Sequence, residues 1–229
     1  MGISNLTVLC QITAFVLSFI LSFFIFVPLA VNQYQFNGHC LLYATGTWNA
    51  TSEQLTNVQW GPNSACGFGM FIGVVMMLLT IFYMCIDALH LLRDTDSSWL
   101  DSCLTTLVSF VIMLMLFAES ITISVGFKHW CNVITTQPAG LVSCELAPFI
   151  PFDSSDNIDA SSFYIHMKMA EFGSWSSFIC WAFLFATSVI RVIRYQQHES
   201  FMTSVNRERE RILQKYGPRN RGEYSAVPT

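Results

Sequence analysis

Charged side chains are scarce in this chain: Asp, Glu, Lys and Arg make up 11% of its 229 residues. An ordinary soluble domain holds about 25%. No formally charged side chain occurs before Glu53, so the basic n-region of a secretory signal peptide is missing. The low charge excludes a typical soluble domain, and the uncharged start predicts that the first apolar segment is kept as a helix.

Motifs for catalysis and metal binding are missing as well. The five histidines are dispersed, and no HExxH, GxSxG, Walker or kinase signature occurs. The cysteine spacings match no zinc motif. We therefore expect no enzyme activity, no metal, no cofactor and no nucleic-acid partner.

Apolar residues, in contrast, are concentrated in four segments. A hydrocarbon core about 30 Å thick needs roughly 20 helical residues to span it. The segments that meet this length lie at about 8–31 (with Pro28 near its end), 68–92, 104–127 and 172–193. They predict an all-α membrane protein, with a four-helix transmembrane bundle over residues 1–194. Outer loops at about 32–66 and 128–170 and a cytoplasmic tail at 195–229 complete the predicted organisation.

Basic residues are distributed unevenly around these segments. If both termini are cytoplasmic, nine of the eleven Lys and Arg residues lie on the inner side, and only Lys128 and Lys168 lie outside. Basic residues favour cytoplasmic loops and helix flanks. The bias predicts cytoplasmic termini, in the plasma membrane or in a secretory or endosomal vesicle membrane.

Four of the eight cysteines lie in the two loops predicted to be outside. They are Cys40 and Cys66 in the first loop, and Cys131 and Cys144 in the second. Disulfides persist in oxidising compartments, so the four residues predict two bridges that staple small outer loops. Three pairings are open; short-range closure favours one bridge within each loop.

Three acidic side chains lie within the apolar segments or directly next to one. Glu119 is the deepest, roughly 12 Å inside the outer end of the third segment. Asp87 lies near the inner end of the second segment, and Glu171 near the outer end of the fourth. An acid within the membrane is a functional-site hypothesis by default. Three interpretations of Glu119 stay open: a neutral or hydrogen-bonded structural residue, a contact for a partner's helix, and a site for proton or cation transport.

Gly69 and Gly73 form a GxxxG motif in the second segment. Small residues four apart let two membrane helices approach closely. The motif predicts a packing face within the bundle, and homodimerisation stays open as the alternative.

The tail combines basic residues with apolar residues at roughly helical spacing. Phe201, Val205, Ile212 and Tyr216 recur in this way before Gly217 and Pro218 end the pattern. The excess of basic residues suits an anionic inner-leaflet surface, and topology anchoring is an equal alternative.

Short motifs predict modification and sorting. A sequon begins at Asn49, which predicts one glycan in the first outer loop. Tyr224 with Val227 resembles a tyrosine-based sorting signal. Ile212 with Leu213, behind Glu208, resembles an acidic-dileucine signal.

Several stretches together resemble one known family. They are Val27-Pro28-Leu29, Gly38-His39-Cys40-Leu41-Leu42, Trp60-Gly61-Pro62 before Cys66, Ser124-Val125-Gly126-Phe127, Trp130-Cys131, Ser143-Cys144 and Phe172-Gly173-Ser174-Trp175. The chain is similar to the transmembrane protein 179 family over nearly its whole length up to about Arg194. The claudin signature of Gly-Leu-Trp before two first-loop cysteines is absent, because Cys40 precedes Trp48.

The resemblance implies a four-helix membrane protein without an established biochemical activity, so no catalytic residue is carried over. We expect a non-enzymatic scaffold, accessory or trafficking partner of other membrane proteins. Its partners are then the lipid bilayer and those proteins, with homo-oligomerisation left open. The alternative is a small ion channel or proton-coupled transporter that uses Glu119.

Overall fold

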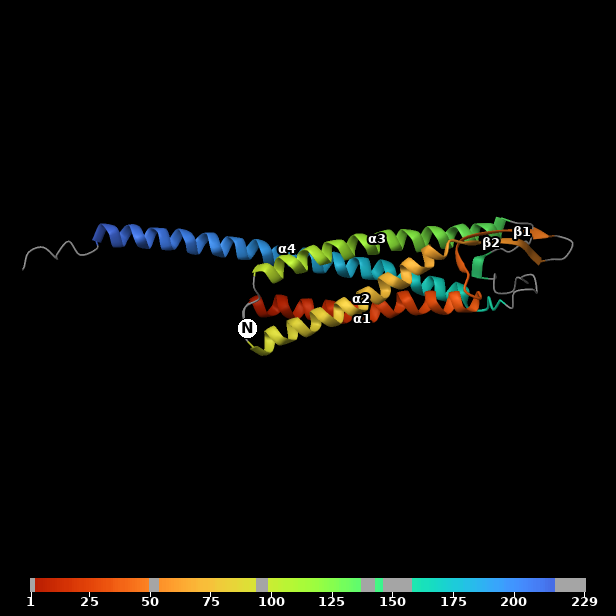
Figure 1. The fold of residues 1–229 in the computed structure, drawn as a ribbon, viewed down its shortest axis with the longest axis horizontal. Helices are drawn as coiled ribbons and strands as arrows, with labels where there is room; N and C mark the ends of the chain where they lie inside the picture. Colours follow the sequence, from red (N-terminus) through yellow and green to blue (C-terminus); the bar gives the residue numbers. More distant parts are fainter. Residues whose placement is uncertain (1–2, 50–53, 94–98, 137–142, 146–157, 217–229) are drawn as a thin grey trace, which may run out of the picture.

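The computed structural model describes residues 3–49, 54–93, 99–136, 143–145 and 158–216. Its elements are α1 (Ile3–Gln35), β1 (Cys40–Asn49), β2 (Gln54–Gly61), α2 (Asn63–Arg93), α3 (Trp99–Thr136) and α4 (Phe163–Tyr216). Figure 1 shows one elongated helical bundle with the β1–β2 hairpin at one end, here called the cap end. At the opposite end, the tail end, α4 projects beyond the other helices. Each helix is long and apolar enough to cross a membrane, which confirms the predicted four-span fold.

The helices are longer than the apolar segments that predicted them. α4 differs most, because it begins at Phe163 rather than near residue 172 and continues to Tyr216 through the predicted tail. α3 runs on to Thr136. Hydropathy predicts only the helical turns that cross the hydrocarbon core of the membrane. Backbone hydrogen bonding continues into polar turns that contain no strong helix breaker.

Pro28 does not end α1, which continues to Gln35. A proline removes the helical donor for the carbonyl four residues earlier, here that of Phe24. α4 approaches α1 at this carbonyl through Gly173. A Cβ added to Gly173 would lie 3.1 Å from the Phe24 oxygen and 2.8 Å from Phe24 Cβ. Close packing between α1 and α4 therefore occurs where the proline leaves a carbonyl without its usual donor.

Aromatic rings fill the middle of the bundle. Phe15 of α1 stacks on Tyr83 of α2, with ring centroids 5.4 Å apart, and meets Trp181 of α4 edge-on at 6.2 Å. Trp181 also donates a 2.7 Å hydrogen bond from Nε1 to Ser18 Oγ of α1. α1 therefore packs on both α2 and α4, while α3 packs mainly on α4.

The cap is an antiparallel hairpin that one disulfide fastens to the helices. Cys40, the first residue of β1, is bonded to Cys66 in the first turn of α2. The hairpin lies against α3 at Gly126, where an added Cβ would lie 3.0 Å from Leu42 Cβ. Under the hairpin, Phe36 is fully buried.

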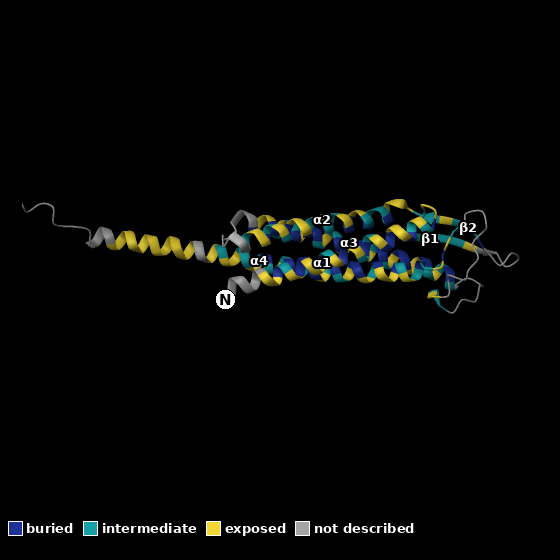
Figure 2. Ribbon diagram, turned by 90° about the horizontal axis from the view of Figure 1, so that it is seen from below, coloured by how far each residue is buried: buried dark blue, intermediate teal, exposed yellow. Residues whose placement is uncertain are grey.

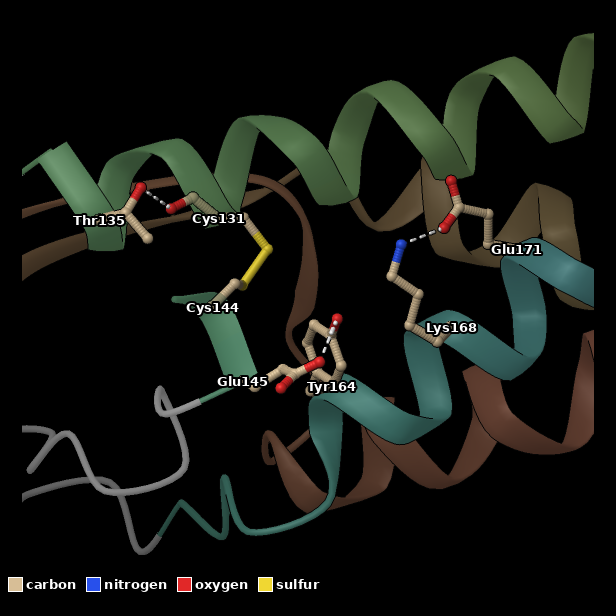
Figure 3. The surroundings of a disulfide bond; sticks show 7 residues. All are labelled: Cys131, Thr135, Cys144, Glu145, Tyr164, Lys168 and Glu171. Atoms are coloured by element: carbon tan, nitrogen blue, oxygen red, sulfur yellow. Dashed lines mark hydrogen bonds and ion pairs between the residues drawn. A yellow bond between two sulfur atoms is a disulfide. The ribbon is translucent and has the colours of Figure 1, made fainter. Parts of the chain in front are cut away.

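The second disulfide joins Cys131 of α3 to Cys144. Figure 3 shows the neighbouring contact, in which the Tyr164 hydroxyl of α4 donates to Glu145 Oε1 at 3.2 Å. Cys144 and Glu145 thus link α3 to the start of α4. Both bridges follow the short-range pairing, which is confirmed.

Candidate functional site

Glu119 of α3 is fully buried. A Cβ placed on Gly69 of α2 would lie 3.2 Å from Glu119 Oε1 and 2.6 Å from Leu29 Cδ1 of α1. Within the described part of the chain, neither carboxylate oxygen of Glu119 has a hydrogen-bond partner. The side chain therefore points into the contact between three helices of its own bundle. This position weakens the interpretation of Glu119 as a contact for a partner's helix, because such a contact would have to face lipid.

A carboxyl group in this position needs a proton, a cation or water to offset its loss of hydration. A charged side chain at the centre of a membrane helix costs about 2.5–3.5 kcal/mol on insertion scales. Buried polar groups are normally hydrogen-bonded, so two buried oxygens without a partner among the described residues are unusual. Chemically, Glu119 can hold a proton or contribute to binding a cation. Gly69 and Leu29, its immediate neighbours, offer no side-chain ligand.

The other two acids lie apart from Glu119 or have their own partner. Asp87, which is 9% exposed, lies roughly 27 Å along α2 from Gly69. Glu171 of α4 pairs with Lys168, with 2.8 Å between Nζ and Oε2 (Figure 3). Among the residues with described placement, no three His, Cys, Asp or Glu side chains could hold a metal together. Glu119 and Asp87 therefore belong to different levels of the bundle.

The two glycines of the GxxxG motif both face α1. Gly69 lies against Leu29, and a Cβ on Gly73 would lie 2.8 Å from Phe26 Cβ and 3.2 Å from the Phe26 backbone nitrogen. Both glycines are buried. This arrangement supports the interpretation as an internal packing face, because the chain's own α1 occupies the face that a second copy would need.

The bonded and free cysteines are segregated along the bundle. Both disulfides lie at the cap end. Cys10, Cys85 and Cys103 are free and exposed on the apolar helices, whereas Cys180 is buried with its Sγ 3.3 Å from the carbonyl of Ala14.

The predicted modification and sorting motifs are only partly described. Asn49 is the last residue of β1, at the tip of the hairpin, but its side chain and residues 50–53 lie outside the described residues. Tyr224 and Val227 also lie outside them. Ile212 is exposed on α4, and only the backbone of Leu213 is described. The glycan and both sorting signals stay predictions.

A polar contact near the tail end was not predicted from the sequence. Arg191 of α4 donates to Gln11 Oε1 of α1, and Gln11 Nε2 lies 3.5 Å from Thr187 Oγ1. Gln11 is buried. The available signal was a single amide within an apolar run, together with an arginine at the end of another run. The contact fixes the point at which α4 leaves the bundle.

Beyond this contact, α4 continues alone as a projecting helix (Figures 1 and 2). Every described side chain from Ser200 to Ile212 is exposed. We define the tail stripe as Phe201, Val205 and Ile212, which are 63%, 44% and 56% exposed. The tail stripe is the second candidate site.

Comparison with known proteins identifies the family to which the chain belongs. The sequence model of the family described as the transmembrane protein 179/179B claudin domain matches residues 7–213. The chain belongs to this family. Transmembrane protein 179B of Danio rerio is 23% identical over 165 residues, which cover 70% of this chain and 73% of the relative. Transmembrane protein 179B of Homo sapiens is 22% identical over 164 residues, 69% of this chain and 71% of the relative. No solved structure matches.

Membership of the transmembrane protein 179/179B family confirms the resemblance and the multi-pass class. The match extends to residue 213, so it includes the tail stripe and reaches past the limit at Arg194 that the short motifs indicated. The family is described as a claudin domain, although the chain lacks the claudin signature of Gly-Leu-Trp before two first-loop cysteines. The absence of this signature therefore does not separate the chain from that family. One short motif was too narrow a criterion, because the family match includes the hairpin, α2, α3 and nearly all of α1 and α4.

Proposed function

We propose that this protein is a non-enzymatic accessory or scaffold protein that holds a partner on the projecting part of α4. The observation that carries the proposal is the tail stripe, which holds three of the four large apolar side chains left exposed between Ser200 and Ile212, on a helix that stands clear of the bundle; the fourth is Met202. Burial of apolar surface contributes roughly 25 cal/mol per Å², and an apolar helix face is a common docking surface. A helix in this position is suited to recruiting another protein to the membrane.

The proposal includes an orientation with the tail end in the cytoplasm. Both disulfides lie at the cap end, which suits an oxidising compartment. The basic residues of the α4 extension suit the cytoplasmic side. A glycan at Asn49, detected as a mobility shift that a glycosidase removes and that Asn49→Gln abolishes, would require the cap to face the secretory lumen or the exterior. A second sequon engineered elsewhere in the hairpin serves as a further test. If neither Asn49 nor this second site is glycosylated, the proposed orientation is contradicted.

Rigid presentation of the tail stripe supports the same proposal. Hydrogen bonds from Trp181 to Ser18 and from Arg191 to Gln11 fix α4 against α1. α4 contains no proline, and its only glycine, Gly173, lies far from the stripe. The stripe therefore has a defined direction relative to the bundle.

Cross-linking in cells tests the proposed function. A photoreactive amino acid at position 212 of the full-length protein should yield an adduct with a defined second protein. The matched control is position 210, because Glu210 is exposed but lies on roughly the opposite face of α4 from Phe201. Equal labelling from both positions, or no protein adduct from position 212, would contradict a docking role for the stripe.

A proton or cation transporter is the second candidate function, favoured by the two Glu119 oxygens that have no partner among the described residues. The scaffold proposal predicts that purified protein in liposomes shows no proton, Na⁺ or K⁺ flux above empty liposomes. It also predicts that Glu119→Gln changes neither flux nor cross-linking from position 212. A flux that Glu119→Gln abolishes, with the variant still folded by thermal unfolding, would reject the scaffold as the main function.

A further inference from the structure

We propose that the partner of the tail stripe is an acidic amphipathic helix of a cytoplasmic protein. The proposal rests on the proposed function, because it names the partner chemistry of the same site. It is carried by the spacing of the stripe, by the charges beside it and by the direct continuation of α4 from the bundle.

The spacing of the stripe fits side-by-side packing with another helix. At 3.6 residues per turn, Phe201, Val205 and Ile212 lie within about 40° of one another around α4. The separations of four and seven residues are those of an apolar seam between two packed helices. The seam is short, so flanking charges contribute much of its selectivity.

The charges beside the stripe favour an acidic partner. Arg209 lies about 60° from the centre of the stripe and has no ion-pair partner among the described residues. Glu208, on the other edge, is already paired with Arg211, with 2.8 Å between Oε1 and Nη1. Glu210 lies on the opposite face. A partner helix with acidic residues flanking its own apolar seam would complement Arg209.

Other copies and segments of this chain fit the stripe less well. A second copy packed in parallel would place Arg209 near Arg209 and Glu208 near Glu208, and like charges across a helical seam repel. The sequence beyond Tyr216 contains Arg219 and Arg221 against one acidic residue, Glu223, so it is also net basic.

The lipid surface is also a poor occupant. The stripe begins roughly 15 Å beyond Arg191 along the helix axis, measured at 1.5 Å per residue. Lying on the inner leaflet would require a sharp bend, and such bends usually occur at proline, glycine or an inserted group. The sequence from Arg191 to Tyr216 contains neither proline nor glycine.

Peptide binding to the full-length protein in nanodiscs tests the proposal. Two labelled helical probes share the same Leu and Ile seam, and carry either Glu or Lys at all flanking positions. We expect the acidic probe alone to bind by fluorescence anisotropy. Ile212→Ser should weaken its binding by roughly tenfold or more, as loss of a central apolar contact does. Arg209→Glu should weaken the binding of the acidic probe and allow the basic probe to bind.

Glu210→Gln is the matched control, because position 210 faces away from the stripe; it should leave the binding of the acidic probe unchanged. Equal binding of both probes, or an unaltered preference in Arg209→Glu, would overturn the acidic-partner inference. A cross-link from position 212 to a second copy or to lipid would overturn it too. If neither probe binds while position 212 still cross-links to another protein, this inference fails and the proposed function stands. If position 212 no longer cross-links to another protein, both this inference and the proposed function are contradicted.

Discussion

Gly173→Ala is expected to destabilise the bundle by about 2 kcal/mol, within the range of about 1–3 kcal/mol that overpacking costs. The added Cβ would lie 2.8 Å from Phe24 Cβ, 3.0 Å from the Phe24 carbonyl carbon and 3.1 Å from its oxygen. Two of these atoms belong to the backbone of α1, so relief requires the two helices to separate. Thermal unfolding of the detergent-solubilised protein, followed by tryptophan fluorescence, measures the loss.

Gly67→Ala is the matched control, because a Cβ at Gly67 meets nothing within 4 Å. Alanine is favoured over glycine in a helix by roughly 1 kcal/mol, so this variant should be as stable as the wild type or slightly more stable. Gly173→Ala unfolding at the wild-type temperature would contradict the packing of α4 on α1. An equal loss in both variants would show that the destabilisation does not come from the contact of Gly173 with Phe24.

Replacing Cys40 and Cys66 together by serine is expected to unfold the hairpin while leaving the helices formed. The bridge closes a separation of 26 residues, for which chain entropy gives about 3.5 kcal/mol. A two-stranded hairpin is marginally stable by itself in water. Hydrogen exchange should show lost protection of β1 and β2 amides, while circular dichroism retains the helical signal.

The double replacement of Cys131 and Cys144 is the comparison for this effect. It opens a separation of 13 residues, for which the same relation gives about 2.9 kcal/mol, and neither cysteine lies in the hairpin. Protection of β1 and β2 should therefore persist in that variant. A hairpin that stays protected without the Cys40–Cys66 bridge would show that packing on α3, at Gly126, is sufficient to hold the cap.

The spans and the disulfides could be predicted because each depends on short-range sequence. A run of apolar residues long enough to cross hydrocarbon leaves the backbone few structures other than a helix. The bridge between Cys131 and Cys144 closes a short loop, so proximity along the chain favoured it. The ends of the helices were predicted less well, because α1 continues through Pro28 to Gln35, past the predicted end at residue 31.

The direction of individual side chains could not be predicted. Hydropathy placed Glu119 in the third span but could not choose between lipid and the bundle interior, because apolar residues surround it on every side of the helix. The contact of Gly173 with Phe24 depends on how α4 is rotated against α1. The α4 extension was visible as a helical pattern, yet its continuity with the span depends on the absence of a break between Arg191 and Phe201.

That continuity links the cap mechanically to the tail stripe. Tyr164, bonded to Glu145 at the cap, and Ile212 belong to one helix, so a rotation of one about the helix axis turns the other equally. Each residue inserted between them would turn the stripe by about 100° and advance it by about 1.5 Å. Seven residues would nearly restore its direction. The angular phase of α4, in addition to its composition, therefore constrains which lengths this helix can have.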